Sequence, residues 1–268
     1  MHTLCTAHAQ GMHLWRASRP KVNALWASLL ALAVAGPVTA QEAVDLELVL
    51  LADATSSIDA VEHAMQRRGY AAALVDPEVL GAIEAGGELG RIAVTYVEWA
   101  SRRRQDVVVD WAVVGDAGSA LAFAERIVAA PRRVHGVNAI GAALLKGVEL
   151  IETNRFDGFR KVIDLSGDSA WNPRAPTLPE ARAAAVEAGV VINALAVLCD
   201  APCSGRQGAG NLEVEFAERV IAGPGAFVVT ADSRASFADA VRRKLVLEIA
   251  ALGPGTGRGR APIGLHAP

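Results

Sequence analysis

The sequence contains few cysteines and no set of residues spaced for zinc. Its three cysteines are Cys5, Cys199 and Cys203. A structural zinc ion needs four cysteine or histidine ligands at short spacings, and no histidine beyond residue 40 has such a spacing to the later cysteine pair. A zinc domain is therefore disfavoured. Cys199 and Cys203 either form a disulfide in an oxidising compartment or remain two free thiols.

Motifs of several common enzyme classes are also absent. The chain has no G-x-S-x-G nucleophile motif and no D-x-D phosphatase loop. Its Gly223-Pro224-Gly225 stretch precedes a predicted strand, whereas a glycine-rich phosphate loop follows one. No repeat of about 20–50 residues is visible, which excludes solenoids and propellers. We therefore expect no catalytic residues and no enzyme activity.

Acidic residues are missing from the N-terminal segment, where the first one is Glu42. Three basic residues precede an apolar run at 24–34, a helix-breaking Gly-Pro pair and small residues at 38–40. This pattern predicts a signal peptide over residues 1–40, cleaved after Ala40, and hence a periplasmic or secreted protein. The apolar run is shorter than the roughly 20 residues of a membrane span. An uncleaved N-terminal anchor is the alternative, and both Met1 and Met12 are candidate start residues.

Cleavage would leave an acidic protein. The formal net charge of the chain is −3, and it would become −6 because three positive charges and no negative one leave with the signal. An acidic surface is a poor partner for nucleic acid or anionic membranes, and no second apolar stretch is long enough to cross a bilayer. We expect one domain over residues 41–251, followed by a flexible tail at 252–268 that is rich in Gly and Pro.

Apolar runs typical of buried strands alternate with helical patterns along this domain, which predicts an α/β fold with a mostly parallel sheet. The expected strands are 46–52, 91–99, 107–114, 161–165, 190–197 and 226–230. The expected helices are 57–75, 77–83, 117–129, 138–152, 179–188, 212–221 and 233–250. The short link between the second and third strands predicts an antiparallel hairpin. Its arginine run, 102–104, is interpreted as a solvated turn rather than as an anion site.

Oxygen-bearing side chains follow two of the predicted strands. Asp53, Thr55 and Ser57 form a D-x-T-x-S sequence directly after the first strand, and Asp168 follows the strand at 161–165. The carboxyl ends of parallel strands lie at one edge of a sheet, so these residues are expected on the same rim. Carboxylate and hydroxyl oxygens are ligands that hard divalent cations prefer.

This arrangement resembles the von Willebrand factor A (vWA) domain and its metal-ion-dependent adhesion site (MIDAS). The resemblance covers residues 44–250 and implies metal ligands in three loops: Asp53, Thr55 and Ser57 in the first, Asn138 in the second, and Asp168 in the third. It implies a Rossmann-like sheet with one antiparallel edge strand and helices on both faces. Thr55 stands where the pattern usually has Ser, and Asn138 where it usually has Thr. The segments 94–99, 223–228 and 242–245 also resemble an uncharacterised family of secreted bacterial proteins.

The resemblance implies a binding module that engages a protein ligand through a divalent cation, completed by an acidic side chain of that ligand. Mg²⁺ is the expected ion, with Ca²⁺ and Mn²⁺ as alternatives. No nucleic acid partner and no membrane insertion after signal cleavage are expected. Two other functions stay open: a metal-dependent hydrolase that uses Asp53 or Asp168, and a vWA fold that has lost its metal. Asp53 and Ser57 could also serve only as helix N-caps, and Asp168 as a brace of its own loop.

Overall fold

The computed structural model describes residues 41–198, 212–233 and 235–250. The predicted signal peptide, the predicted tail and both Cys199 and Cys203 lie outside these residues. The strands are β1 (Glu42–Asp53), β2 (Ile92–Trp99), β3 (Gln105–Val114), β4 (Phe156–Gly167), β5 (Val191–Val197) and β6 (Val228–Ala231). The helices are α1 (Ala60–Leu74), α2 (Pro77–Ala85), α3 (Ala117–Ala129), α4 (Ile140–Thr153), α5 (Leu178–Glu187), α6 (Leu212–Arg219) and α7 (Phe237–Ala250).

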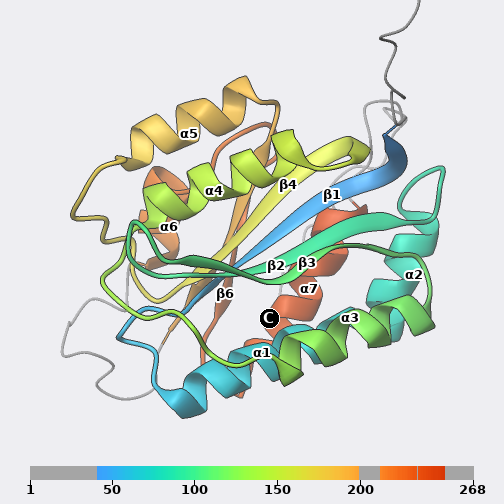
Figure 1. The fold of residues 1–268 in the computed structure, drawn as a ribbon, viewed down its shortest axis with the longest axis horizontal. Coiled ribbons are helices and arrows are strands. Elements are labelled where there is room, and N and C mark those ends of the chain that lie inside the picture. The colour runs from blue at the N-terminus through green and yellow to red at the C-terminus, as the bar shows by residue number, and fades with distance from the viewer. Residues whose placement is uncertain (1–40, 199–211, 234, 251–268) are drawn as a thin grey trace, which may run out of the picture. The chain divides into compact units, whose positions relative to one another are not determined.

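The strands form one six-stranded sheet in the order β3-β2-β1-β4-β5-β6, with β1 near its centre (Figure 1). β1 runs parallel to both β2 and β4, and β5 and β6 continue the parallel pairing. Only β3, at one edge, is antiparallel to its neighbour β2. The prediction of a mostly parallel sheet with one antiparallel edge strand is confirmed.

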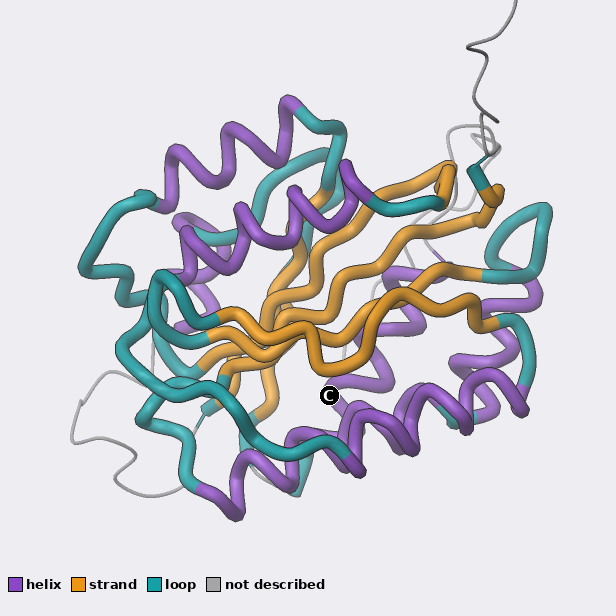
Figure 2. The backbone as a smooth tube through the Cα atoms, in the orientation of Figure 1, coloured by secondary structure: helices purple, strands orange, loops and turns teal. Residues whose placement is uncertain are grey.

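Helices cover both faces of this sheet, as Figures 1 and 2 show. Helices α1, α2, α3 and α7 lie on one face, and α4, α5 and α6 lie on the other. Alternate residues of β1 point to opposite sides: Leu48 and Leu50 join the first core, and Val49 and Leu51 join the second. A central strand buried on both faces therefore reads as a nearly continuous apolar run, which is how it was recognisable in the sequence. Among the helices of the described ranges, none combines the length and hydrophobicity that crossing a membrane requires.

The structure extends β1 to an earlier start than the sequence predicts. Two carboxylates near the start of β1 are buried, Asp45 in the added part and Glu47 within the predicted strand, and each has defined donors. Asp45 accepts hydrogen bonds from the backbone amides of Glu88, Leu89 and Arg91. Glu47 accepts from the Asn154 side chain and from the Gly158 amide. Because these donors satisfy the carboxylates, acidic residues are tolerated in the strand.

β4 is also longer than predicted and carries a buried carboxylate, Asp164, in its C-terminal half. The ammonium group of Lys244 on α7 lies 2.7 Å from Asp164 Oδ1 and also contacts Glu248. Asn193 on β5 donates to Glu248 Oε1 at 3.0 Å. The ammonium group of Lys244 thus contacts two buried carboxylates and links α7 to the middle of the sheet.

Replacement of Lys244 by alanine is expected to destabilise the fold by about 3–5 kcal/mol, because it leaves two buried carboxylates without a cation. Urea unfolding followed by circular dichroism measures this loss. The neighbouring Arg243 is exposed, so Arg243→Ala serves as the control and is expected to change stability little. Equal stability of the two variants would contradict the structural role of Lys244.

Glu248 generates a pH dependence of stability. Burial, and next the charge of Asp164, raise the pKa of Glu248 from 4.5 to about 7. Between these values the folded protein keeps a proton that the unfolded chain releases, so the free energy of unfolding falls as pH rises from 4.5 to about 7. Glu248→Gln should remove this contribution and flatten the curve over that interval. Denaturant unfolding at a series of pH values compares the variant with the parent protein, and parallel curves would contradict the assignment.

Candidate metal centre

The first and third predicted loops lie side by side because β1 and β4 are neighbours in the sheet. The pairing of these strands reaches Leu51 opposite Leu165, and each strand continues for two more residues, to Asp53 and Gly167. Asp168 follows immediately. The loops after both strands therefore leave the same rim of the sheet, at the left of Figure 1.

Asp53 is buried, with 1% of its surface exposed. Its Oδ1 accepts a hydrogen bond from the Thr55 amide at 2.8 Å. Its Oδ2 is buried and has no hydrogen-bond partner among the described residues. Burial, and next the charge of Asp168, raise the pKa of Asp53 to about 8. Two carboxyl groups thus lie close enough to repel each other, an arrangement that a bound cation would relieve.

The glycine that ends β4 leaves space for the Asp53 carboxylate. A Cβ atom at Gly167 would lie 3.4 Å from Asp53 Oδ2 and 3.4 Å from the Trp99 ring. A larger side chain there would fill the volume beside the unpartnered oxygen.

The hydroxyl groups of the first loop are adjacent. Thr55 is buried, Ser57 is half-buried, and their side-chain oxygens are 2.9 Å apart. Neither residue caps the following helix, because α1 begins three residues after Ser57 with Asp59 as its N-cap. The alternative in which Asp53 and Ser57 act as helix N-caps is therefore wrong.

The second loop is bound to the first one. The amide of Ser56 donates to the Gly136 carbonyl at 2.9 Å. Gly136 has a positive φ of 146°, and a Cβ atom there would lie 3.0 Å from the side chain of Ser101. Asn138, two residues later, is half-buried. It does not cap helix α4, whose N-cap is Ala139 without a side-chain hydrogen bond.

The third loop is held near the second by Asn172. The Asn172 Oδ1 atom accepts a hydrogen bond from the Gly141 amide at the start of α4, at 3.1 Å. Its amide nitrogen donates to the carbonyls of Arg174 and Pro176. Asp168 is half-buried at the beginning of this loop. The three loops of the predicted site are thus connected through backbone and side-chain hydrogen bonds.

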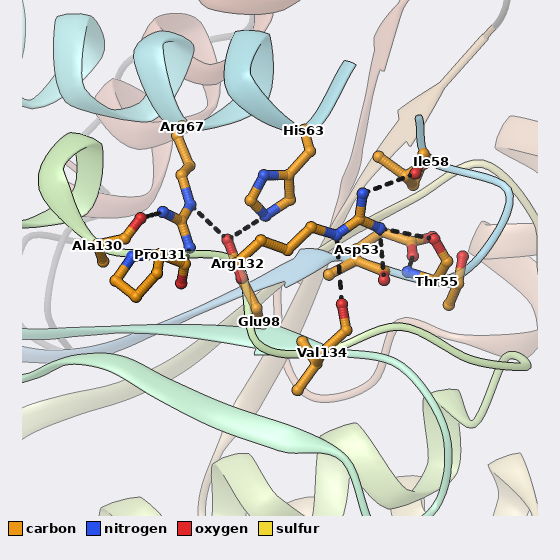
Figure 3. Close-up of polar contacts among 11 residues, drawn as sticks. Asp53, Thr55, Ile58, His63, Arg67, Glu98, Ala130, Pro131, Arg132 and Val134 are labelled. Carbon is orange, nitrogen blue, oxygen red and sulfur yellow. Dashed lines mark hydrogen bonds and ion pairs between the residues drawn. The ribbon is translucent and has the colours of Figure 1, made fainter. Parts of the chain in front are cut away.

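Arg132 connects these loops, and the sequence did not predict this role. Its guanidinium group donates to the carbonyls of Ala54, Thr55 and Ile58 in the first loop, at 3.0–3.2 Å (Figure 3). It also donates to the carbonyl of Val134 in its own segment, at 3.3 Å. The partners are all backbone carbonyls, so no side-chain motif could have revealed this role.

A buried cluster of Glu98, His63 and Arg67 holds the chain just before Arg132. Glu98, at the end of β2, accepts hydrogen bonds from His63 and Arg67 of α1, each at 2.7 Å (Figure 3). Burial alone would raise the pKa of Glu98, but hydrogen bonds and charge from His63 and Arg67 lower it overall. Arg67 also donates to the carbonyls of Ala130 and Pro131. Glu98 therefore holds Arg67 in place, and Arg67 in turn fixes the segment that leads into the second loop.

The predicted ligands are two carboxylates, two hydroxyls and one amide oxygen. This composition suits a hard divalent cation such as Mg²⁺ and offers no thiolate or imidazole to a softer one. The described ranges contain no cluster of three or more His, Cys, Asp or Glu residues. A cation here would therefore depend on neutral oxygens as well as on the two carboxylates.

Comparison with known families identifies the chain. Residues 43–253 match the family described as "Protein of unknown function (DUF1194)". The chain belongs to this family. No curated protein matches it.

Solved structures show which fold this DUF1194 protein has. It is similar to a von Willebrand factor type A structure from Catenulispora acidiphila, with 14% identity, a TM-score of 0.52 and coverage of 77% of this chain and 43% of that one. It is also similar to proximal thread matrix protein 1 of the mussel byssus, with a zinc-occupied MIDAS motif, at 18% identity, a TM-score of 0.51 and coverage of 79% and 46%. A third similar structure is the pilus adhesin SpaC from Lactobacillus rhamnosus GG, at 15% identity, a TM-score of 0.50 and coverage of 78% and 31%. The chain spans less than half the length of each, and the likeness shows the vWA fold.

Replacement of Arg132 by methionine is expected to weaken the attachment between the first two loops. The change keeps much of the side-chain length but removes donors to four carbonyls, which should cost about 2–4 kcal/mol. Amide hydrogen exchange should report faster opening of residues 54–58, and urea unfolding should report the loss of stability. The adjacent Arg133 is exposed, so Arg133→Met is the control. Unchanged exchange in the Arg132 variant would contradict the bracing role.

Proposed function

We propose that this protein is a metal-dependent adhesion module. Asp53, Thr55, Ser57, Asn138 and Asp168 hold one divalent cation, and an acidic side chain of a protein partner completes its coordination. The observation that carries the proposal is the unpartnered, buried Oδ2 of Asp53 beside the carboxylate of Asp168. A buried carboxylate oxygen without a donor is costly, and a cation is the partner that would stabilise two such carboxylates at once.

The charge of the ligand set supports an open coordination position. Two carboxylates would neutralise a divalent ion, while the hydroxyl and amide ligands add no charge. An incoming carboxylate is attracted to such an ion more strongly than to one surrounded by additional acidic ligands. Mg²⁺ is the proposed ion because it accepts a few protein oxygens and keeps bound water in its remaining positions. Ca²⁺ and Mn²⁺ are the alternatives.

Structural neighbours support the general type of function. One of them carries a zinc-occupied MIDAS motif, and another is a pilus adhesin. They support a metal-dependent contact with another macromolecule outside the cell, to which the proposed signal peptide at residues 1–40 would direct this protein. In this chain the oxygen donors favour a harder ion than zinc.

The polar contacts near the site support binding rather than catalysis. The Ser57 hydroxyl contacts Thr55, and the Nε2 atom of His63 contacts Glu98. A nucleophilic serine needs a base within hydrogen-bond reach, and these contacts supply none to Ser57. We therefore propose that the protein is not an enzyme.

Titration with Mg²⁺, Mn²⁺ and Ca²⁺ tests the proposed site. In the parent protein, an ion at a hundred times its dissociation constant should stabilise the fold by about 2.7 kcal/mol, seen as a rise in Tm. Asp53→Ala should abolish this rise, and Asn138→Ala should reduce it, because each removes one proposed ligand. Calorimetry of the same titrations provides the affinity.

Asp157→Ala is the matched control, because Asp157 is exposed and lies at the start of β4, at the other end of the strand from Asp168. It should respond to metal like the parent protein. Absence of any metal effect in the parent protein would reject the site and favour a vWA fold without metal. An equal effect in the Asp53 variant would place the ion elsewhere.

A further inference from the structure

Four of the described loops lie around the proposed metal site, and their charge differs from that of the whole chain. The loops are 54–59, 100–104, 130–139 and 168–177. They contain six arginines, namely Arg102, Arg103, Arg104, Arg132, Arg133 and Arg174, against two acidic residues, Asp59 and Asp168. The chain as a whole has a formal net charge of −3. Positive charge is therefore concentrated in these four loops of a chain that is acidic overall.

The arginine run lies in the turn between β2 and β3. Backbone hydrogen bonds from Ala100 to Arg104 and from Arg104 to Ser101 close this turn. Ser101 also lies against Gly136, two residues before Asn138. The turn is thus held beside the second loop of the metal site, and it is not an isolated hairpin tip.

The arginines at the rim are free to meet a ligand, with the exception of Arg132. The side chains of Arg102, Arg103, Arg104, Arg133 and Arg174 are exposed. In the part of the chain that the structure describes, none of these five side chains has an ion pair or hydrogen bond. Guanidinium groups bind carboxylates through two parallel hydrogen bonds, which makes an arginine cluster a specific receptor for acidic groups.

We propose that this rim, defined by the arginines at 102–104 and 133 together with the metal site, binds an acidic segment of a protein partner. One carboxylate of the segment would coordinate the metal, and neighbouring carboxylates would pair with the arginines. The metal half of this contact rests on the proposed function, whereas the arginine half does not. The arginine run that appeared to be only a solvated turn would then determine which acidic ligands are preferred.

Apolar side chains beside the site favour a protein segment over other polyanions. Val137, next to Asn138, is 54% exposed, and Trp171, three residues after Asp168, is 41% exposed. A peptide can present apolar side chains between its carboxylates and cover both residues. The net negative charge of the chain also disfavours long polyanions such as nucleic acids, because their other charges would be repelled.

Fluorescence anisotropy with two labelled synthetic peptides of equal length tests the proposal in the presence of Mg²⁺. The first peptide has a single Asp-Leu pair in a Gly/Ser background, and the second has the same pair followed by three glutamates. The parent protein should bind the second peptide about tenfold more tightly than the first, and rising salt should reduce that preference. The triple variant R102S/R103S/R104S should bind both peptides equally.

A second triple variant, R155S/R219S/R243S, provides the control. It makes the same change in net charge at exposed arginines before β4, at the end of α6 and on α7. It should keep the preference for the acidic peptide. Equal affinity of the parent protein for both peptides, or equal loss in the two triple variants, would overturn the proposal.

Two further measurements separate this proposal from the metal site and from other ligands. Asp53→Ala should weaken binding of both peptides but keep their ratio. If Asp53→Ala and chelation have no effect while the ratio persists, the metal site fails and the arginine surface stands. Competition with heparin and with a single-stranded oligonucleotide completes the test. Tighter binding of either polymer than of the acidic peptide would overturn the assignment to a protein segment.

Discussion

The parallel pairing of β1 with β4 places two carboxyl groups at one rim of the sheet. Asp53 ends the first strand and Asp168 follows the second, and the charge of Asp168 contributes to the raised pKa of Asp53. Like charges at a partly buried position are unfavourable in the absence of a cation. The repulsion between the two carboxyl groups therefore destabilises the folded protein without a cation, and binding of a cation would relieve it. The proposed function follows from this electrostatic relation.

Buried polar groups elsewhere in the fold keep that rim in position. Lys244 joins α7 to Asp164 in the C-terminal half of β4, and Glu98 joins β2 to His63 and Arg67 on α1. Arg132 then connects the first loop with the second through backbone carbonyls. Each of these contacts joins segments far apart in the chain. A metal ligand set spread over three loops needs such fixed positions, because small displacements of its oxygens would lower the affinity.

Several parts of the structure follow from short-range patterns. Helix α3 has the bounds that its sequence predicts, because Asp116 caps its start and Pro131 follows shortly after its end. The prediction was too short for β1 and β4, where buried charges interrupt or border the apolar pattern. Glu47 interrupts the apolar run of β1, and Asn154 and Gly158, more than a hundred positions away, supply its hydrogen bonds. Whether a buried strand tolerates a charged residue depends on a hydrogen-bond partner that can be far away in the sequence.

The alternation of apolar strands and amphipathic helices was sufficient for the α/β class, the antiparallel edge and the D-x-T-x-S loop, because hydrophobic period and turn residues act over a few positions. Folding in three dimensions decided the rest. It gave Ser57 a hydroxyl neighbour instead of a capping role, made Arg132 the brace of two loops, and brought the arginine turn beside the loop that contains Asn138. The last two outcomes depend on hydrogen bonds and packing between segments that are remote in sequence, and such contacts exist only once the sheet has assembled.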